Sequence, residues 1–172
     1  MKNLLVIILI IGSYIFIGNM MEDKIIPDEA IRLRVLASSN SLEDQRIKML
    51  VAKTVQEELY STLKEATSVD DARTKILDTI PEISTKVEQT LKENKTDDTY
   101  YINFGKNYFP SKSYKGINYN AGNYESLLIK INEGKGDNWW CVLFPPLCLL
   151  EAEESTDVEY KLLIKEIIEK YS

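Results

Sequence analysis

The hydrophobic pattern of the chain changes near residue 95, and this change limits the class of fold that the chain can adopt. Between residues 42 and 93 the apolar side chains recur every three or four positions, as on the buried stripe of an amphipathic helix. From residue 99 to 144 the chain is rich in tyrosine, asparagine and glycine, with short alternating or apolar runs. That pattern is typical of strands separated by turns. We therefore expect an α+β domain.

Three helices are expected in the first of these regions. A helix over about 42–65 is expected to start after Ser41, because Ser41 followed by Asp44 resembles a capping box with Asp in place of the usual Glu or Gln. A second helix is expected over 69–79. Because Pro81 removes a helix hydrogen bond, a third helix is expected to start there. The stripe that the first helix should bury consists of Ile47, Val51, Val55, Leu59 and Leu63.

Four strands are expected around these helices. Residues 31–37 alternate between apolar side chains and the pair Arg32 and Arg34, as in a half-buried strand. The later strands are expected at 99–105, 124–134 and 139–144, with a loop over 106–123 and a final helix capped by Ser155. A short glycine-rich turn joins the last two strands, so they are expected to pair as an antiparallel hairpin. The expected fold is a mainly antiparallel sheet of about four strands with helices packed on it, in the order β-ααα-β-β-β-α.

Residues 1–20 have the pattern of a targeting segment. Lys2 precedes an apolar run from Leu4 to Ile17, whose 14 residues are shorter than a membrane-spanning helix usually requires. No clear cleavage site follows, so the segment is either a signal peptide or an anchor at residues 4–17. A buried N-terminal strand or helix is the alternative. Residues 21–172 are expected to form a single exported domain.

Composition argues against several classes of function. The formal net charge is -6 and no basic run offsets it, so a protein or peptide partner is expected and a nucleic acid is not. The chain has no histidine, which excludes histidine-dependent triads and histidine-ligated metals. Two cysteines are too few for a four-thiolate zinc site. We assign no catalytic, metal-binding or cofactor-binding residue.

Residues 136–148, GDNWWCVLFPPLC, contain both tryptophans and both cysteines. Trp139 and Trp140 are adjacent on a strand and should face opposite sides, one in the core and the other covered or exposed. In an exported protein Cys141 and Cys148 are expected to form a disulfide that closes an eight-residue loop. Two buried thiols, or a redox pair, are the alternatives.

Two stretches resemble the stage II sporulation protein R family of endospore-forming Firmicutes. They are IPDEAIRLRVLASSNSLEDQRIK at 26–48 and the segment 109–150, whose NWWCVLFPPLC core is very specific. The sequence departs from the family pattern at some turn and cap positions. Asn132, for example, stands where the family usually has glycine.

The resemblance implies an exported signalling protein of endospore formation. Such proteins are made in the forespore and exported into the space between the two membranes of the sporangium. There they activate a membrane-embedded aspartic protease of the mother cell, which processes the sigma-E precursor. The family member is the activating ligand and not an enzyme, and it would touch the membrane only through an uncleaved N-terminal segment. An exported hydrolase and a structural envelope domain are the alternatives.

From these observations we predict a surface that contacts the protease. Arg32 and Arg34 suit carboxylate recognition because guanidinium groups bind carboxylates through two parallel hydrogen bonds. A solvated strand face, or structural salt bridges, is the alternative for this pair. The predicted contact residues are Arg32, Arg34, Asn138, Trp139, Trp140, Phe144, Pro145 and Pro146.

Overall fold

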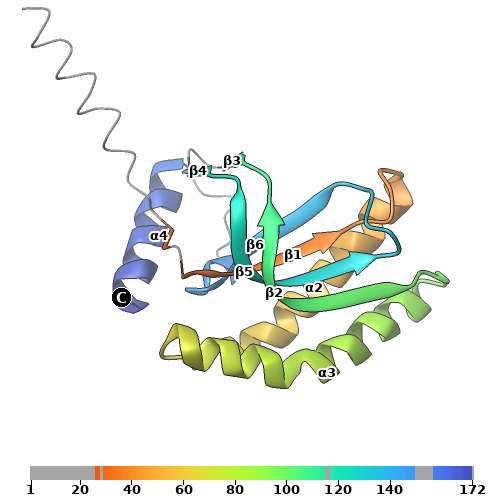
Figure 1. Cartoon of the computed structure of the whole chain (residues 1–172), viewed down its shortest axis with the longest axis horizontal. Coiled ribbons are helices and arrows are strands. Elements are labelled where there is room, and N and C mark those ends of the chain that lie inside the picture. Colours follow the sequence, from red (N-terminus) through yellow and green to blue (C-terminus); the bar gives the residue numbers. More distant parts are fainter. Residues whose placement is uncertain (1–25, 28, 115–116, 150–156, 172) are drawn as a thin grey trace, which may run out of the picture.

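The computed structural model describes residues 26–27, 29–114, 117–149 and 157–171. The expected targeting segment and the expected cap Ser155 lie outside these residues. Figure 1 shows an α+β fold, as expected from the sequence. Its elements are β1 (Ile31–Leu36), α2 (Leu42–Leu63), α3 (Val69–Glu93), β2 (Tyr100–Phe109), β3 (Lys112–Tyr114), β4 (Ile117–Tyr119), β5 (Gly122–Ile131), β6 (Asn138–Phe144), a 3-10 turn (Leu147–Leu149) and α4 (Asp157–Tyr171).

The main sheet is mixed and not mainly antiparallel. Its strand order is β2-β5-β1-β6, with β1 parallel to β5 and antiparallel to β6, while β2 and β5 are antiparallel. The predicted hairpin between β5 and β6 is wrong because β1 lies between these two strands. β3 and β4 form a separate two-stranded sheet.

The loop at 132–137 crosses the end of β1, and this crossing explains why β5 and β6 do not pair. The amide of Gly136 donates to the carbonyl of Ala37 at 2.9 Å, and the amide of Ala37 donates to the carbonyl of Asp137 at 3.4 Å. A Cβ on Gly136 would lie 2.2 Å from the carbonyl oxygen of Ser39. Glycine therefore allows the two backbones to approach closely enough for the loop to pass β1.

Side chains of the turn after β1 hold the same loop in place. The amide of Asp137 donates to Asn40 Oδ1 at 2.6 Å, and Asn132 Nδ2 donates to Ser38 Oγ at 3.0 Å. Asn132 has a φ of 49°, a left-handed conformation that asparagine tolerates better than most residues. The exchange of the usual glycine for asparagine is therefore compatible with the local backbone. These hydrogen bonds therefore join the two stretches that resemble the family, 26–48 and 109–150.

The main core lies between one face of the sheet and the helices α2 and α3 (Figure 1). The stripe predicted for α2 is confirmed, because its five residues are all at most 2% exposed. Ser41 caps this helix by accepting from the amide of Asp44 at 3.1 Å.

Pro81 does not end a helix, contrary to the prediction, because α3 runs continuously from Val69 to Glu93. Ile76 precedes the proline and Ile83 follows it, and both are fully buried in the same core. The ring of Pro81 lies on the exposed side of the helix. Packing on both sides of the proline therefore outweighs the local cost of about 3 kcal/mol for a proline inside a helix.

Residues 106–123 are largely strand and not the predicted loop. β2 continues to Phe109, and β3 and β4 form a hairpin before β5 begins at Gly122. Figure 1 shows β2 and β5 bending away from α2 and α3 towards this hairpin. The bend brings Phe109 and Tyr124 over the face of the sheet that those helices do not cover.

α4 contributes to a second, smaller core on the other side of the sheet. Ile164 is fully buried there in a cluster that includes Val142 and Leu147. Tyr171 of the same helix packs against the main core, edge-on to Phe144 with ring centroids 5.2 Å apart. Within the part of the chain that the structure describes, none of the helices combines the length and apolar character needed to cross a membrane.

Candidate functional site

The face of the sheet turned away from α2 and α3 carries the polar and aromatic side chains of the four strands. Strand register aligns Asn103, Leu128, Arg34 and Trp140 in one row across the sheet, because paired residues share a face. The next row consists of Tyr101, Lys130, Leu36 and Asn138. We call these eight residues the open face.

Arg32 lies in the row before these two and is only 3% exposed. Its guanidinium carbon is 3.4 Å from the ring centroid of Tyr124 and 5.4 Å from those of Phe109 and Trp140. These rings come from β5, β2 and β6, so Arg32 links the bent strands to the far edge of the sheet. Cation–π attraction of this kind is strongest in a desolvated site. Arg32 is therefore an inner residue of this face, packed among aromatic rings.

Arg34 is partly exposed and has a different environment. Its Nη1 donates to the carbonyl of Tyr108 at 2.5 Å, and its guanidinium carbon is 5.5 Å from the Phe109 ring centroid. Within the described residues its buried Nε has no hydrogen-bond acceptor. Burial lowers the pKa of the Arg34 guanidinium, which nevertheless stays charged at neutral pH. The Arg34 side chain therefore carries a positive charge in a fixed position, and its Nε donor has no acceptor among the described residues.

The two tryptophans face opposite sides of β6, as their adjacency predicts. Trp139 packs against the main core, whereas Trp140 packs against the smaller core. The ring of Trp140 meets Phe109 and Tyr119 edge-on, with centroids 5.6 and 4.8 Å away. Trp140 thus joins the open face to the aromatic group around Arg32.

The remaining predicted contact residues differ in their exposure. Phe144 is 1% exposed and lies in the main core, and Pro145 is buried, so neither side chain is exposed for contact. Asn138 and Pro146 are partly exposed. The structure does not gather the eight predicted residues on one exposed surface. It places Arg34, Asn138 and Trp140 together on the open face and puts Trp139 on the helix side.

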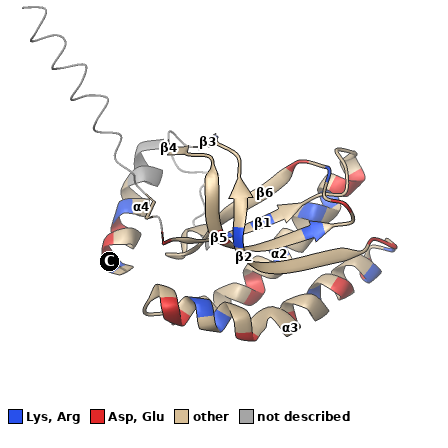
Figure 2. Cartoon of the chain, in the orientation of Figure 1, with Lys and Arg blue, Asp and Glu red and all other residues tan. Residues whose placement is uncertain are grey.

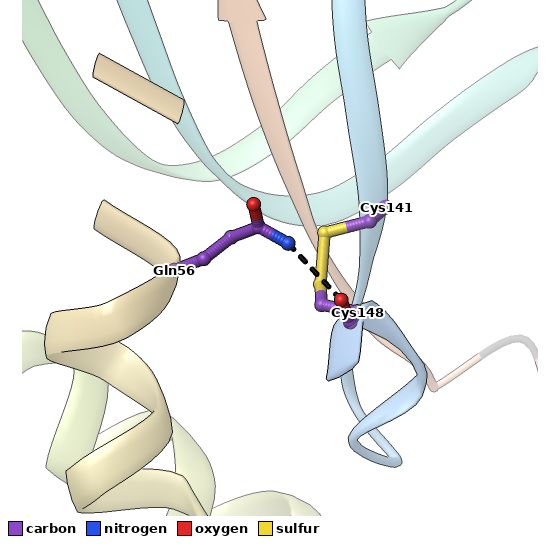
Figure 3. The surroundings of a disulfide bond; sticks show 3 residues. All are labelled: Gln56, Cys141 and Cys148. Carbon is purple, nitrogen blue, oxygen red and sulfur yellow. Dashed lines mark hydrogen bonds between the residues drawn. A yellow bond between two sulfur atoms is a disulfide. The ribbon is translucent and has the colours of Figure 1, made fainter. Parts of the chain in front are cut away.

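The expected disulfide between Cys141 and Cys148 is confirmed, with Cα atoms 5.3 Å apart. It ties the 3-10 turn back to β6, and Gln56 of α2 donates to the carbonyl of Cys148 at 3.0 Å (Figure 3). A small apolar depression beside it is lined by Leu59, Leu143 and Pro146, among others. The bridge therefore fixes the end of β6 against the helical layer.

Ser126, which belongs to the second family motif, lies under the surface and is fully buried. Its hydroxyl accepts a hydrogen bond from Asn107 Nδ2 at 3.0 Å. Among the described residues, no three histidine, cysteine or acidic side chains converge as in a metal site. The polar groups of Ser126 and Asn107 therefore bond to each other inside the domain and do not form a metal site.

Sequence reasoning missed five of the eight open-face residues, namely Leu36, Tyr101, Asn103, Leu128 and Lys130. The alternation of β5 already places Leu128 and Lys130 on one side of that strand. The sequence did not indicate the parallel pairing of β5 with β1, which puts Leu128 opposite Arg34 and Lys130 opposite Leu36.

Comparison with known proteins places this chain among sporulation proteins. It belongs to the stage II sporulation protein R family, because that family's model matches residues 27–154. It is also 42% identical over 130 residues to the stage II sporulation protein R of Bacillus subtilis (strain 168). That alignment covers 76% of this chain and 58% of the relative, so the chain spans little more than half of the relative's length. No solved structure matches the chain. The family resemblance is confirmed, and with it a sporulation-related role.

Proposed function

We propose that this chain is an exported signalling protein of endospore formation. It activates a membrane-embedded aspartic protease of the mother cell, and that protease then processes the sigma-E precursor. Membership of the stage II sporulation protein R family is the observation that carries this proposal.

The proposed route is export from the forespore into the space between the two membranes. The apolar run from Leu4 to Ile17 would direct export, and it is either cleaved or kept as an anchor. The bridge between Cys141 and Cys148 supports this route, because disulfides persist in oxidising compartments outside the cytosol.

In this proposal the chain acts as a ligand and not as the protease. The absence of histidine removes the usual general base, which is consistent with a non-enzymatic role. The contact would be made by Arg34, Asn138 and Trp140 on the open face. Arg32 would shape that surface from inside the domain, Phe144 and Pro145 are buried, and Trp139 and Pro146 border the helix side of β6.

The test is co-expression of this chain with its candidate protease and the sigma-E precursor in a host that does not form spores. Cleavage of the precursor should require all three proteins, as seen on an immunoblot. A protease with an active-site aspartate changed to asparagine is the control for cleavage by host enzymes. Cleavage that proceeds equally well without this chain would refute the signalling role.

A further inference from the structure

We propose that the open face binds an extended, carboxylate-bearing segment of the partner protein, with Arg34 as the principal carboxylate-binding residue. This inference rests on the proposed function, because it takes that segment from the protein that the chain activates. It specifies both the surface of this chain and the chemistry of its ligand.

The charge on the open face is opposite in sign to the net charge of the whole chain. The chain as a whole has a net charge of -6, yet the eight open-face residues include two cations, Arg34 and Lys130, and no acidic side chain. Lys112 of β3 adds a third positive charge, with its Nζ 5.5 Å from the Trp140 ring centroid. Figure 2 shows both acidic and basic residues along α3, so the two signs of charge are mixed on that helix. A basic patch on an acidic protein attracts an acidic partner.

The cations on and beside the open face have no carboxylate partner among the residues that the structure describes. Arg46 and Arg73, which lie on the helices, pair with Glu43 and Glu125 at 2.6 Å. Within the described part of the chain Arg34, Lys112 and Lys130 form no ion pair with a carboxylate. Arg34 is also held in one position by the carbonyl of Tyr108, so little freedom is left to lose on binding.

The two rows of the open face have a geometry that suits an extended peptide. Arg34 and Lys130 lie on neighbouring parallel strands and are offset by two residues, which separates their Cα atoms by about 8 Å. Asn103 and Asn138 stand in the same rows and carry amide groups that can bond to a peptide backbone. Tyr101, which is 53% exposed, and Trp140 provide aromatic contact area of the type enriched at binding hot spots. These features fit an extended peptide better than a lipid headgroup.

The experiment compares full-length chains that carry Arg34→Gln, Arg34→Lys, Lys130→Gln or Arg46→Gln. Arg46 is the matched control, because it is an exposed arginine on α2, away from the open face. Affinity for the full-length candidate protease in detergent is measured at low and high salt, and precursor cleavage is measured in the co-expression host. Thermal unfolding of each variant verifies its fold.

The proposal predicts about tenfold or greater loss of affinity for Arg34→Gln, with a parallel loss of precursor cleavage. The affinity of Arg34→Lys should lie between those of Arg34→Gln and the unmodified chain, because lysine keeps the charge but lacks the planar guanidinium group. Lys130→Gln should mainly reduce the salt dependence of the affinity for the protease. Arg46→Gln should have the affinity and the cleavage activity of the unmodified chain. Changing exposed acidic residues of the protease to amides should reproduce the effect of Arg34→Gln.

The outcomes separate this inference from the proposed function. If the unmodified chain triggers no cleavage, the proposed function fails. If the unmodified chain triggers cleavage and a folded Arg34→Gln protein matches it in affinity and cleavage, the inference fails and the function stands. Binding to phosphatidylglycerol vesicles that depends on Arg34, without an effect on protease binding, would also overturn the inference in favour of a lipid surface.

Discussion

Changing both Cys141 and Cys148 to serine should lower the free energy of unfolding by about 2–3 kcal/mol. The bridge closes a loop of eight residues, counting both cysteines, since the two are seven apart in sequence. The chain-entropy relation gives about 2.5 kcal/mol for a loop of that size. Loss of the hydrogen bond from Gln56 to the Cys148 carbonyl would add to this if the 3-10 turn moves away from α2.

Urea unfolding followed by tryptophan fluorescence measures this change, because Trp139 and Trp140 lie on the same strand as Cys141. Reducing the unmodified protein with dithiothreitol should give the stability of the double variant, and the reductant should leave the variant unaffected. A loss below about 0.5 kcal/mol would refute the view that the bridge restrains this loop, since it would be far smaller than the entropy expected.

Four further predictions concern the fold. Gly136→Ala should destabilise the chain by roughly 1–3 kcal/mol, because the new Cβ would meet the Ser39 carbonyl 2.2 Å away; wild-type stability by urea unfolding would contradict this. Leu59→Ala, at 1% exposure, should cost about 2–5 kcal/mol in the same assay. Arg32→Gln should lower stability by about 1–2 kcal/mol through lost ring contacts, and an unchanged unfolding midpoint would argue against its structural role. Hydrogen bonds from Lys75 and from the Thr67 amide hold the pKa of Asp71 below its ordinary value of 3.8, so its stabilising effect is present above that pH and is lost as the pH falls through the lowered pKa. Asp71→Asn should therefore flatten the acid side of the stability profile, and a profile that keeps its slope would contradict the assignment.

The helices were predictable because their signals are local. Residues spaced by four in α2 specify its buried face, and Ser41 marks its start through its own hydroxyl. Pro81 shows the limit of local reasoning, since contacts made by Ile76 and Ile83 with the rest of the core decide whether the helix continues. Propensity is a weak guide where tertiary packing acts on both sides of a residue.

The arrangement of the sheet could not be predicted, because strand order depends on contacts distant in sequence. β1 carries two arginines, a pattern typical of a strand with one face in water. In the structure this strand is central, and Arg32 is buried beneath aromatic rings from three other strands. The bend of β2 and β5 provides two of those rings, Phe109 and Tyr124, and β6 provides Trp140. The turn at 132–137 likewise resembles a hairpin turn until its hydrogen bonds to Ala37 are known.

The residue types of the candidate site could be predicted from the sequence, but the full set of residues that belong to it could not. Arg34 and the segment from Asn138 to Pro146 are recognisable from their residue types. Strand register then adds Leu128 and Lys130 and withdraws Phe144 into the core. Burial of this kind follows from the pairing of the strands and has no local signal.

The most direct test of the proposed role is the removal of this chain from the organism that produces it. Sigma-E precursor and its mature form are then measured by immunoblot through synchronised sporulation, with and without the chain supplied again in the forespore. The signalling role predicts that the precursor accumulates uncleaved in the deletion strain and that forespore expression restores the mature form. Normal maturation in the deletion strain, while the protease and the precursor are present at ordinary levels, would contradict that role.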